Sequence, residues 1–88
     1  MKAYIYILKD KNGKFYIGST SDVYRRLRQH LLGHTQTTRN MDSPRIVLTQ
    51  EVDSLLVARR IESKLKRMKR KDFIEKIVAD GYIKLAKI

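Results

Sequence analysis

The 88-residue sequence contains no cysteine and only two histidines, His30 and His34. The lack of cysteine excludes disulfides and thiolate metal sites, and two histidines are too few for a histidine-rich metal cage. If the protein binds a metal, we therefore expect a hard ion held by oxygen ligands.

Long apolar runs are also missing from the chain. No stretch approaches the roughly 18 apolar residues of a membrane-spanning helix. The apolar run Tyr4–Leu8 is too short for the core of a signal peptide and is typical of a strand. The sequence has one proline and shows no internal repeat, low-complexity tract or linker. We therefore expect a soluble, cytoplasmic protein whose residues 1–88 form a single small domain.

Acidic residues are scarce, with 9 Asp and Glu against 20 Lys and Arg, which gives a formal net charge of +11. Such an excess on a small domain implies a polyanionic partner, and nucleic acid, an anionic membrane surface and ribosomal RNA all fit. The basic stretch Arg59–Lys71 predicts a surface that follows a nucleic-acid backbone, with weak sequence preference because phosphates carry no base identity. The expected nucleic-acid-binding residues are Arg25, Arg39, Arg59, Arg60, Lys64, Lys66, Arg67, Lys69 and Arg70.

The pattern of apolar and polar residues predicts three strands and three helices. Residues rich in Tyr, Ile and Val indicate strands, at Ala3–Lys9, Lys14–Ser19 and Arg45–Val52. Apolar residues at helical spacing indicate helices, beginning after a cap at Ser21, after a cap at Asp53 or Ser54, and at Asp72. The polar stretch His34–Pro44 predicts a loop, while Gly33 and Gly81 are expected to end helices. The order β-β-α-β-α-α predicts an α+β domain with a small three-stranded antiparallel sheet flanked by three helices.

Two hairpin registers are compatible with the turn sequence Lys11-Asn12-Gly13. A two-residue Asn-Gly turn would send Tyr6 and Tyr16 to opposite faces of the sheet. A three-residue loop, with Gly13 left-handed in a bulge, would pair Tyr6 with Gly18 and place both tyrosines on one face. Gly18 would then remove the side chain that crowds Tyr6. We favour the second register because a shared site needs both phenols together, although the turn residues alone leave both registers open.

Five residues stand at spacings that suggest a site for cutting phosphodiesters: Tyr6, Tyr16, Arg26, His30 and Glu62. Arg26 and His30 are four residues apart on a predicted helix and so share one face. Glu62 lies at the edge of an apolar helical stripe. Each residue taken alone has an ordinary structural interpretation. The tyrosines could be packing partners, Arg26 one phosphate anchor among many, His30 a half-exposed helix residue, and Glu62 a partner of Arg59 or Lys66.

Together these residues resemble the signature of the GIY-YIG endonuclease superfamily: two aromatic-ended triplets, then Arg and His on the following helix, then Glu on a later helix. The triplets here are Tyr4-Ile5-Tyr6 and Tyr16-Ile17-Gly18. The likeness covers nearly the whole chain and is greatest to small stand-alone bacterial members. Tyr4 stands where the family name has glycine. We find no counterpart to the Asn that supports the site in some homing endonucleases.

The resemblance implies a metal-dependent DNA endonuclease with low sequence specificity, acting on structured or single-stranded DNA in repair or recombination. It implies that Glu62 holds Mg²⁺ or Mn²⁺, that Arg26 pairs with the phosphate and that Tyr6 is the general base. Tyr16 would orient the water and His30 would relay a proton. The expected partner is DNA, with RNA as a possible partner, no membrane and no small-molecule cofactor, and the expected state is a monomer.

Two other interpretations remain open from the sequence. One is a non-catalytic nucleic-acid-binding module on the same fold, and the other is a basic structural protein of a ribonucleoprotein. The presence of Glu62 favours the enzyme, because an uncompensated carboxylate in a binding groove would repel phosphate. The ribonucleoprotein interpretation predicts no metal effect and no concave site.

Overall fold

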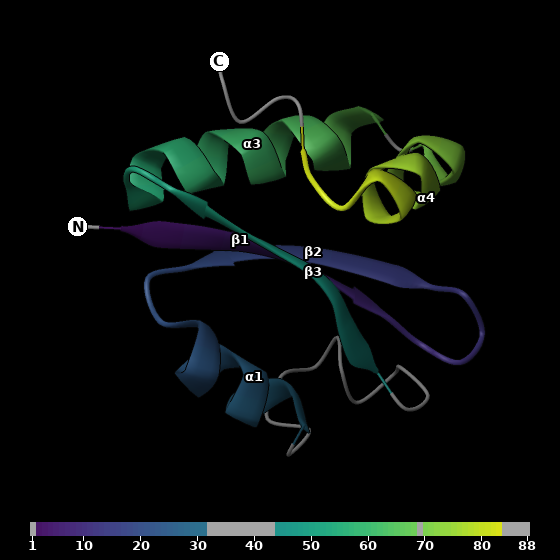
Figure 1. Ribbon diagram of the computed structural model, residues 1–88, viewed down its shortest axis with the longest axis horizontal. Helices are drawn as coiled ribbons and strands as arrows, with labels where there is room; N and C mark the ends of the chain where they lie inside the picture. The colour runs from purple at the N-terminus through teal and green to yellow at the C-terminus, as the bar shows by residue number, and fades with distance from the viewer. Residues whose placement is uncertain (1, 32–43, 69, 84–88) are drawn as a thin grey trace.

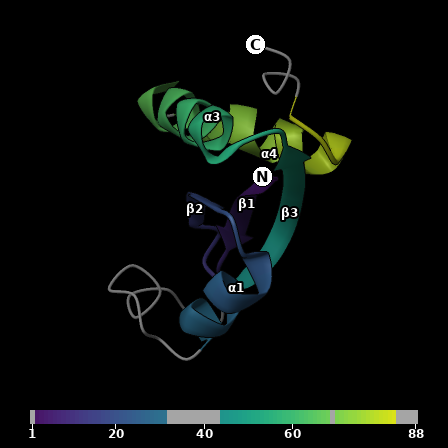
Figure 2. The ribbon, with the colours of Figure 1, turned by 90° about the vertical axis from the view of Figure 1, so that its left-hand side faces the viewer.

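The computed structural model describes residues 2–31, 44–68 and 70–83. The elements follow in the order β1 (Ala3–Lys9), β2 (Phe15–Thr20), α1 (Val23–Leu31), β3 (Arg45–Val52), α3 (Leu55–Met68) and α4 (Lys71–Asp80). Figures 1 and 2 show α3 and α4 on one face of the sheet and α1 on the other. The antiparallel sheet, flanked by helices in the order β-β-α-β-α-α, confirms the predicted fold class.

The observed bounds differ from the predicted ones by single residues. The first and third strands have the predicted bounds, while β2 begins and ends one residue later than the expected Lys14–Ser19. The last helix begins at Lys71 rather than Asp72 and ends, as predicted, at a left-handed Gly81 with φ of 80°. Because assigned ends of helices and strands commonly vary by a residue or two, these differences do not alter the architecture.

Side-chain oxygens cap the starts of α1 and α3. The predicted Ser21 cap is wrong, because Asp22 Oδ1 accepts a hydrogen bond from the Arg25 amide at 3.0 Å. Thr20 Oγ1 accepts from the Asp22 amide at 3.0 Å, which holds the chain so that the Asp22 carboxylate faces the first turn of α1. At the start of α3 the cap is Ser54, whose Oγ accepts from the Val57 amide at 3.2 Å.

The hairpin adopts the three-residue loop, which confirms the favoured register. Tyr6 pairs with Gly18 and Leu8 pairs with Tyr16, and β1 is central in the order β2-β1-β3. Gly13 has φ of 84°, the left-handed conformation that glycine adopts without steric cost. The strand β2 is consequently an edge strand that carries Tyr16 beside a tyrosine of the central strand.

The apolar core lies between the sheet and the pair α3 and α4. Strand side chains of alternating residues point to the same face, so one set of β1 and β2 residues faces these helices. The buried members of this cluster are Ala3, Ile5, Ile7, Ile17, Leu48, Val52, Ala58, Ile61, Leu65, Ile74, Ile77 and Ile83. Burial of the predicted α3 stripe fixes the rotation of this helix and thereby places Glu62 at its rim, near β2.

Some predictions lie outside the described residues. These are the helix end at Gly33, the loop residues 34–43, and the phosphate contacts expected of Arg39 and Lys69. They stay predictions. Among the described helices, none has the length and apolar character needed to cross a membrane.

Candidate active site

Two tyrosines form an aromatic pair on the face of the sheet opposite the apolar core. Their ring centroids are 6.2 Å apart with an interplanar angle of 47°. Tyr6 is 3% exposed, whereas Tyr16 is half-buried on the edge strand. Tyr6 pairs with Gly18 and Tyr16 pairs with Leu8, so the two tyrosines are diagonal neighbours on the same face of the sheet.

Gly18 makes room for the Tyr6 ring. A Cβ added at Gly18 would lie closer than 3.0 Å to the Tyr6 Cζ, Oη and Cε1 atoms. Side chains in closely packed interiors do not tolerate such approaches without movement. Glycine at this position therefore lets the buried phenol lie across the edge strand.

Replacing Gly18 with alanine is expected to displace the Tyr6 ring and to lower the free energy of unfolding by about 1–3 kcal/mol, the usual cost of overpacking. Urea denaturation measures this loss. The cost should largely vanish when Gly18→Ala is made in a Tyr6→Leu background, because the clashing ring is then absent. An equal loss in both backgrounds would show that the ring is not the cause.

The buried position of Tyr6 controls its ionisation. Burial raises the pKa of Tyr6 above its ordinary value of 10.0, and interaction with Tyr16 raises it further, while the charge of Arg26 lowers it. The negative charge of Glu62 also contributes a small increase to the pKa of Tyr6. The Arg26 charge favours the phenolate, but burial outweighs its effect. At neutral pH Tyr6 is a neutral phenol, within electrostatic range of both Arg26 and Glu62.

Glu62 reaches the edge strand from α3. Its side chain is 21% exposed, and Oε2 lies 2.7 Å from Lys66 Nζ. Oε1 accepts a hydrogen bond from Ser19 Oγ at 2.5 Å. Ser19 is not among the site residues predicted from the sequence. The available signal was strand alternation, which puts this hydroxyl on the α3 face, next to Gly18.

Lys66 connects the acid with the aromatic pair. Its ammonium group pairs with Glu62 and also lies 5.6 Å from the centroid of the Tyr16 ring, within cation–π range. One cationic group therefore contacts both the carboxylate and a phenol ring, so the two approach the same small space at the edge of β2. The Glu62–Lys66 pair is also the structural alternative weighed from the sequence.

Arg26 and His30 lie on α1. The half-buried Arg26 lines a cleft of about 230 Å³ at the start of this helix, together with Thr20 and Gln29. Its charge lowers the pKa of Tyr6, against the larger upward effect of burial. His30 follows in the same helix, but its side chain lies outside what the structure describes, so its predicted role stays a prediction.

The structure divides the predicted phosphate-binding residues into separate faces. Arg59 and Lys66 stand three residues before and four after Glu62, so they share its face of α3. A second set occupies another face of the helix, turned away from Glu62 by the helical rotation: Arg60, Lys64 and Arg67. Arg25 is exposed on α1, and Arg70 pairs with Asp72 at 2.9 Å. The basic helix is therefore not one continuous surface facing the acid.

The donor atoms around Glu62 fit an open site for a hard cation. Over residues 2–31, 44–68 and 70–83, no group of three or more His, Cys, Asp and Glu side chains could hold a metal. Mg²⁺, however, commonly uses one or two carboxylates and takes its other ligands from water and substrate phosphate. The Lys66 ammonium beside the carboxylate shows that a positive charge is accommodated there. Glu62, with Ser19 beside it, therefore fits an ion that needs phosphate to complete its coordination.

Comparisons with known proteins point to one family. Residues 2–77 match the GIY-YIG catalytic domain. A UPF0213 protein of Halalkalibacterium halodurans is 38% identical over 72 residues, covering 81% of this chain and 77% of that protein. A UPF0213 protein of Streptococcus pneumoniae is 39% identical over 70 residues, covering 78% of this chain and 71% of that protein.

A solved structure is also similar to this chain. The solution NMR structure of the UPF0213 protein from Bacillus halodurans superposes with a TM-score of 0.58 at 34% sequence identity. The match covers 92% of this chain and 87% of that chain. The predicted family is thus confirmed by sequence and by fold, and the chain belongs to the GIY-YIG nuclease superfamily, among the UPF0213 proteins.

Proposed function

We propose that this chain is a divalent-metal-dependent DNA endonuclease that hydrolyses phosphodiester bonds with low sequence specificity. The observation that supports it most directly is the position of Lys66, whose ammonium group touches both the Glu62 carboxylate and the Tyr16 ring. The carboxylate that would hold a metal ion and the phenols that would handle the attacking water therefore lie around one small space, as metal-assisted hydrolysis requires. The net charge of +11 suits a polyanionic substrate.

The proposed mechanism assigns one task to each side chain. Glu62, with Ser19 beside it, would hold Mg²⁺ or Mn²⁺. When bound, the ion supplies charge neutralisation at the phosphate and lowers the pKa of bound water. Arg26 pairs with the phosphate through its planar guanidinium group, which can donate two parallel hydrogen bonds.

The remaining residues handle the proton and the attacking water. Tyr6 first loses its own phenol proton to solvent, and the phenolate oxygen then accepts the proton of the attacking water. Tyr16 orients that water from the adjacent strand. His30 relays a proton, which its near-neutral ordinary pKa allows. Because the described residues form one such site, each encounter makes one nick in a single strand. Structured and single-stranded DNA arises during repair and recombination. We therefore propose that the enzyme acts in these processes.

Cleavage assays on labelled single-stranded, duplex and branched DNA test this proposal. We expect product with Mg²⁺ or Mn²⁺ and none when EDTA removes the ion, because the cation that neutralises the phosphate charge at Glu62 is then absent. Binding should weaken steeply as salt rises, since phosphate contacts release counterions. The absence of cleavage on all three substrates with both metals would contradict the endonuclease proposal.

A second candidate function is a non-catalytic nucleic-acid-binding module. The Glu62–Lys66 ion pair favours it, because Lys66 compensates the carboxylate and removes the repulsion that this acid would otherwise exert on phosphate. This function predicts salt-sensitive binding with no product in the same assay. The two candidates are therefore separated by one experiment.

Lys66 has a further expected effect on metal binding. Lys66→Met should raise the affinity for Mn²⁺ in the absence of DNA by up to about fivefold, because exposed ion pairs of this kind contribute about 0.2–1 kcal/mol. Titration calorimetry or paramagnetic broadening of NMR signals measures the change. Lys64→Met is the matched control, since it removes the same charge from another face of α3. An unchanged affinity in Lys66→Met would show that the ammonium group and the ion do not compete.

A further inference from the structure

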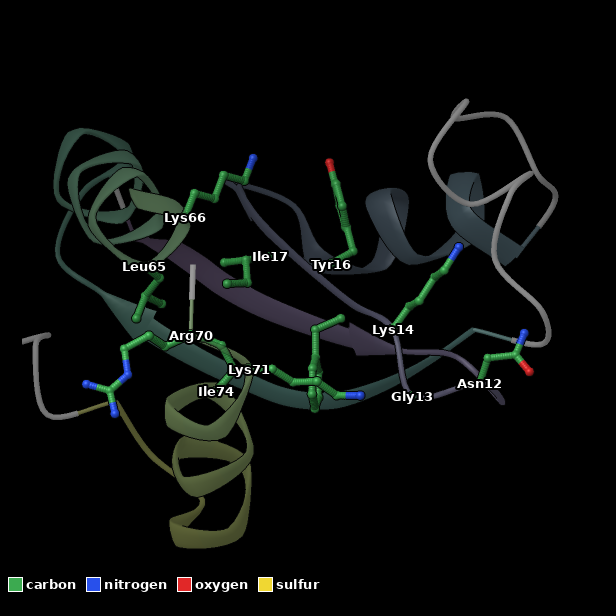
Figure 3. Close-up of a pocket in the computed structure, with 11 residues that line it drawn as sticks. Asn12, Gly13, Lys14, Tyr16, Ile17, Leu65, Lys66, Arg70, Lys71 and Ile74 are labelled. Carbon is green, nitrogen blue, oxygen red and sulfur yellow. The ribbon is translucent and has the colours of Figure 1, made fainter. Parts of the chain in front are cut away.

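A groove of about 490 Å³ adjoins the candidate active site at Tyr16 and lies between the hairpin, the end of α3 and the start of α4 (Figure 3). Its volume is in the range of ordinary small-ligand sites. The interior is apolar and is formed by Phe15, Ile17, Leu65 and Ile74. The described residues that line it include no acidic side chain.

The rim of the groove is basic. Lys14, Lys66 and Lys71 line it, and Figure 3 shows them around the apolar interior with Tyr16. Lys66 is occupied by Glu62, but the ammonium groups of Lys14 and Lys71 have no ion-pair partner in the described part of the chain. Arg70 also lines the groove, but its guanidinium pairs with Asp72.

We propose that this groove receives the base of an unpaired nucleotide of a DNA strand, with the flanking phosphates on Lys14 and Lys71. The inference rests on the proposed function, because Tyr16 belongs to both the groove and the candidate active site. A nucleotide combines a flat, largely apolar base with an anionic backbone, which matches an apolar interior inside a basic rim. The base of an intact duplex is stacked and paired and does not enter, so the groove selects single strands, flaps and unpaired junctions.

Charge argues against other occupants. Residues 84–88 of this chain carry Lys84 and Lys87, and a second copy of the chain carries a net charge of +11. Both would bring positive charge to a rim that is already positive, which disfavours them. A DNA strand brings the opposite sign, and the groove opens beside the residues proposed to cut it.

Binding without cleavage isolates this inference. In EDTA, fluorescence anisotropy would compare an oligothymidylate strand with a strand of the same length made of abasic sites. We expect the base-bearing strand to bind about tenfold more tightly, a typical contribution of one seated base. On the same complex, NMR should show contacts between thymine protons and the methyl groups of Ile17, Leu65 and Ile74.

A pair of variants on one helix provides the control. Lys71→Glu should weaken binding of the oligothymidylate strand roughly tenfold, as expected when a phosphate contact is replaced by repulsion. Glutamate also suits the first turn of α4, so this variant should keep its fold. Lys76→Glu makes the same change on an exposed residue of α4 that does not line the groove, and should cause a clearly smaller loss.

Equal affinity for the two strands, or thymine contacts that fall outside the groove, would overturn the inference. Cleavage separates this failure from failure of the proposed function. If the protein cuts strands with metal but binds both strands equally, the endonuclease proposal holds and the proposed role of the groove is wrong. If the protein binds the base in the groove yet cuts no substrate, the proposed role of the groove holds and the endonuclease proposal is wrong.

Discussion

Glu62→Gln is expected to lower the rate of DNA cleavage by roughly a hundredfold to a thousandfold and to leave DNA binding intact or tighter. Loss of metal-assisted charge stabilisation is worth several kcal/mol in the transition state, and each 1.36 kcal/mol is a factor of ten in rate. Gln keeps the shape of the side chain and can still accept the Ser19 hydrogen bond. It removes only the negative charge that would hold the cation.

The same substitution is expected to affect binding through Lys66. Without the Glu62 charge, the Lys66 ammonium loses its ion-pair partner and becomes available to phosphate. Gel-shift measurements in EDTA check this effect, while cleavage assays with Mg²⁺ and Mn²⁺ check the rate. Glu75→Gln is the matched control, since it removes one exposed carboxylate on α4. If Glu62→Gln cuts every substrate as fast as wild type, Glu62 is not the metal ligand.

Tyr6→Phe is the second substitution with a large expected effect, a loss of roughly a hundredfold to ten-thousandfold in cleavage rate, as is usual for a general base. The phenylalanine ring preserves the packing over Gly18 and removes only the hydroxyl that would carry the proton. Tyr82→Phe is the matched control, because it removes a hydroxyl from a ring that is 51% exposed.

The pH dependence of cleavage tests the same role. Because burial raises the pKa of Tyr6 above 10.0, the reactive phenolate is scarce at neutral pH and becomes more abundant as the pH rises. The wild-type rate should therefore increase about tenfold per pH unit from pH 7 towards pH 10. Tyr6→Phe should reduce this increase of the cleavage rate with pH, because the variant has no phenol to ionise. A slope that is identical in wild type and Tyr6→Phe would exclude Tyr6 as the base.

Local patterns in the sequence were sufficient for the element order and for most strand bounds. Tyr-Ile and Ile-Val runs predict the strands, and the apolar stripe of α3 predicts its buried face. The cap of α1 was mispredicted because Thr20, Ser21 and Asp22 are adjacent and all can accept backbone hydrogen bonds. The Thr20 bond to the Asp22 amide selects among them, and the sequence carries no clear signal for it.

The register of the hairpin could not be predicted from the turn residues alone. Asn12-Gly13 suits both a two-residue and a three-residue loop, so the turn alone did not decide whether Tyr6 and Tyr16 share a face. The deciding feature is the cross-strand pairing of Tyr6 with Gly18, since only glycine leaves space for the buried ring. The sequence predicts that contact for one of the two registers, and only the placement of both strands shows that this register forms.

The amino-acid sequence by itself determined the family, the order of strands and helices, the positive charge and the five residues of the candidate site, because each depends on residue type and spacing along the chain. Only the tertiary structure decided that Ser19 meets Glu62, that Lys66 lies over the Tyr16 ring, that burial keeps Tyr6 protonated, and that an apolar groove opens beside Tyr16. These features depend on distances between separate elements and on exclusion of water, which arise when the helices pack against the sheet.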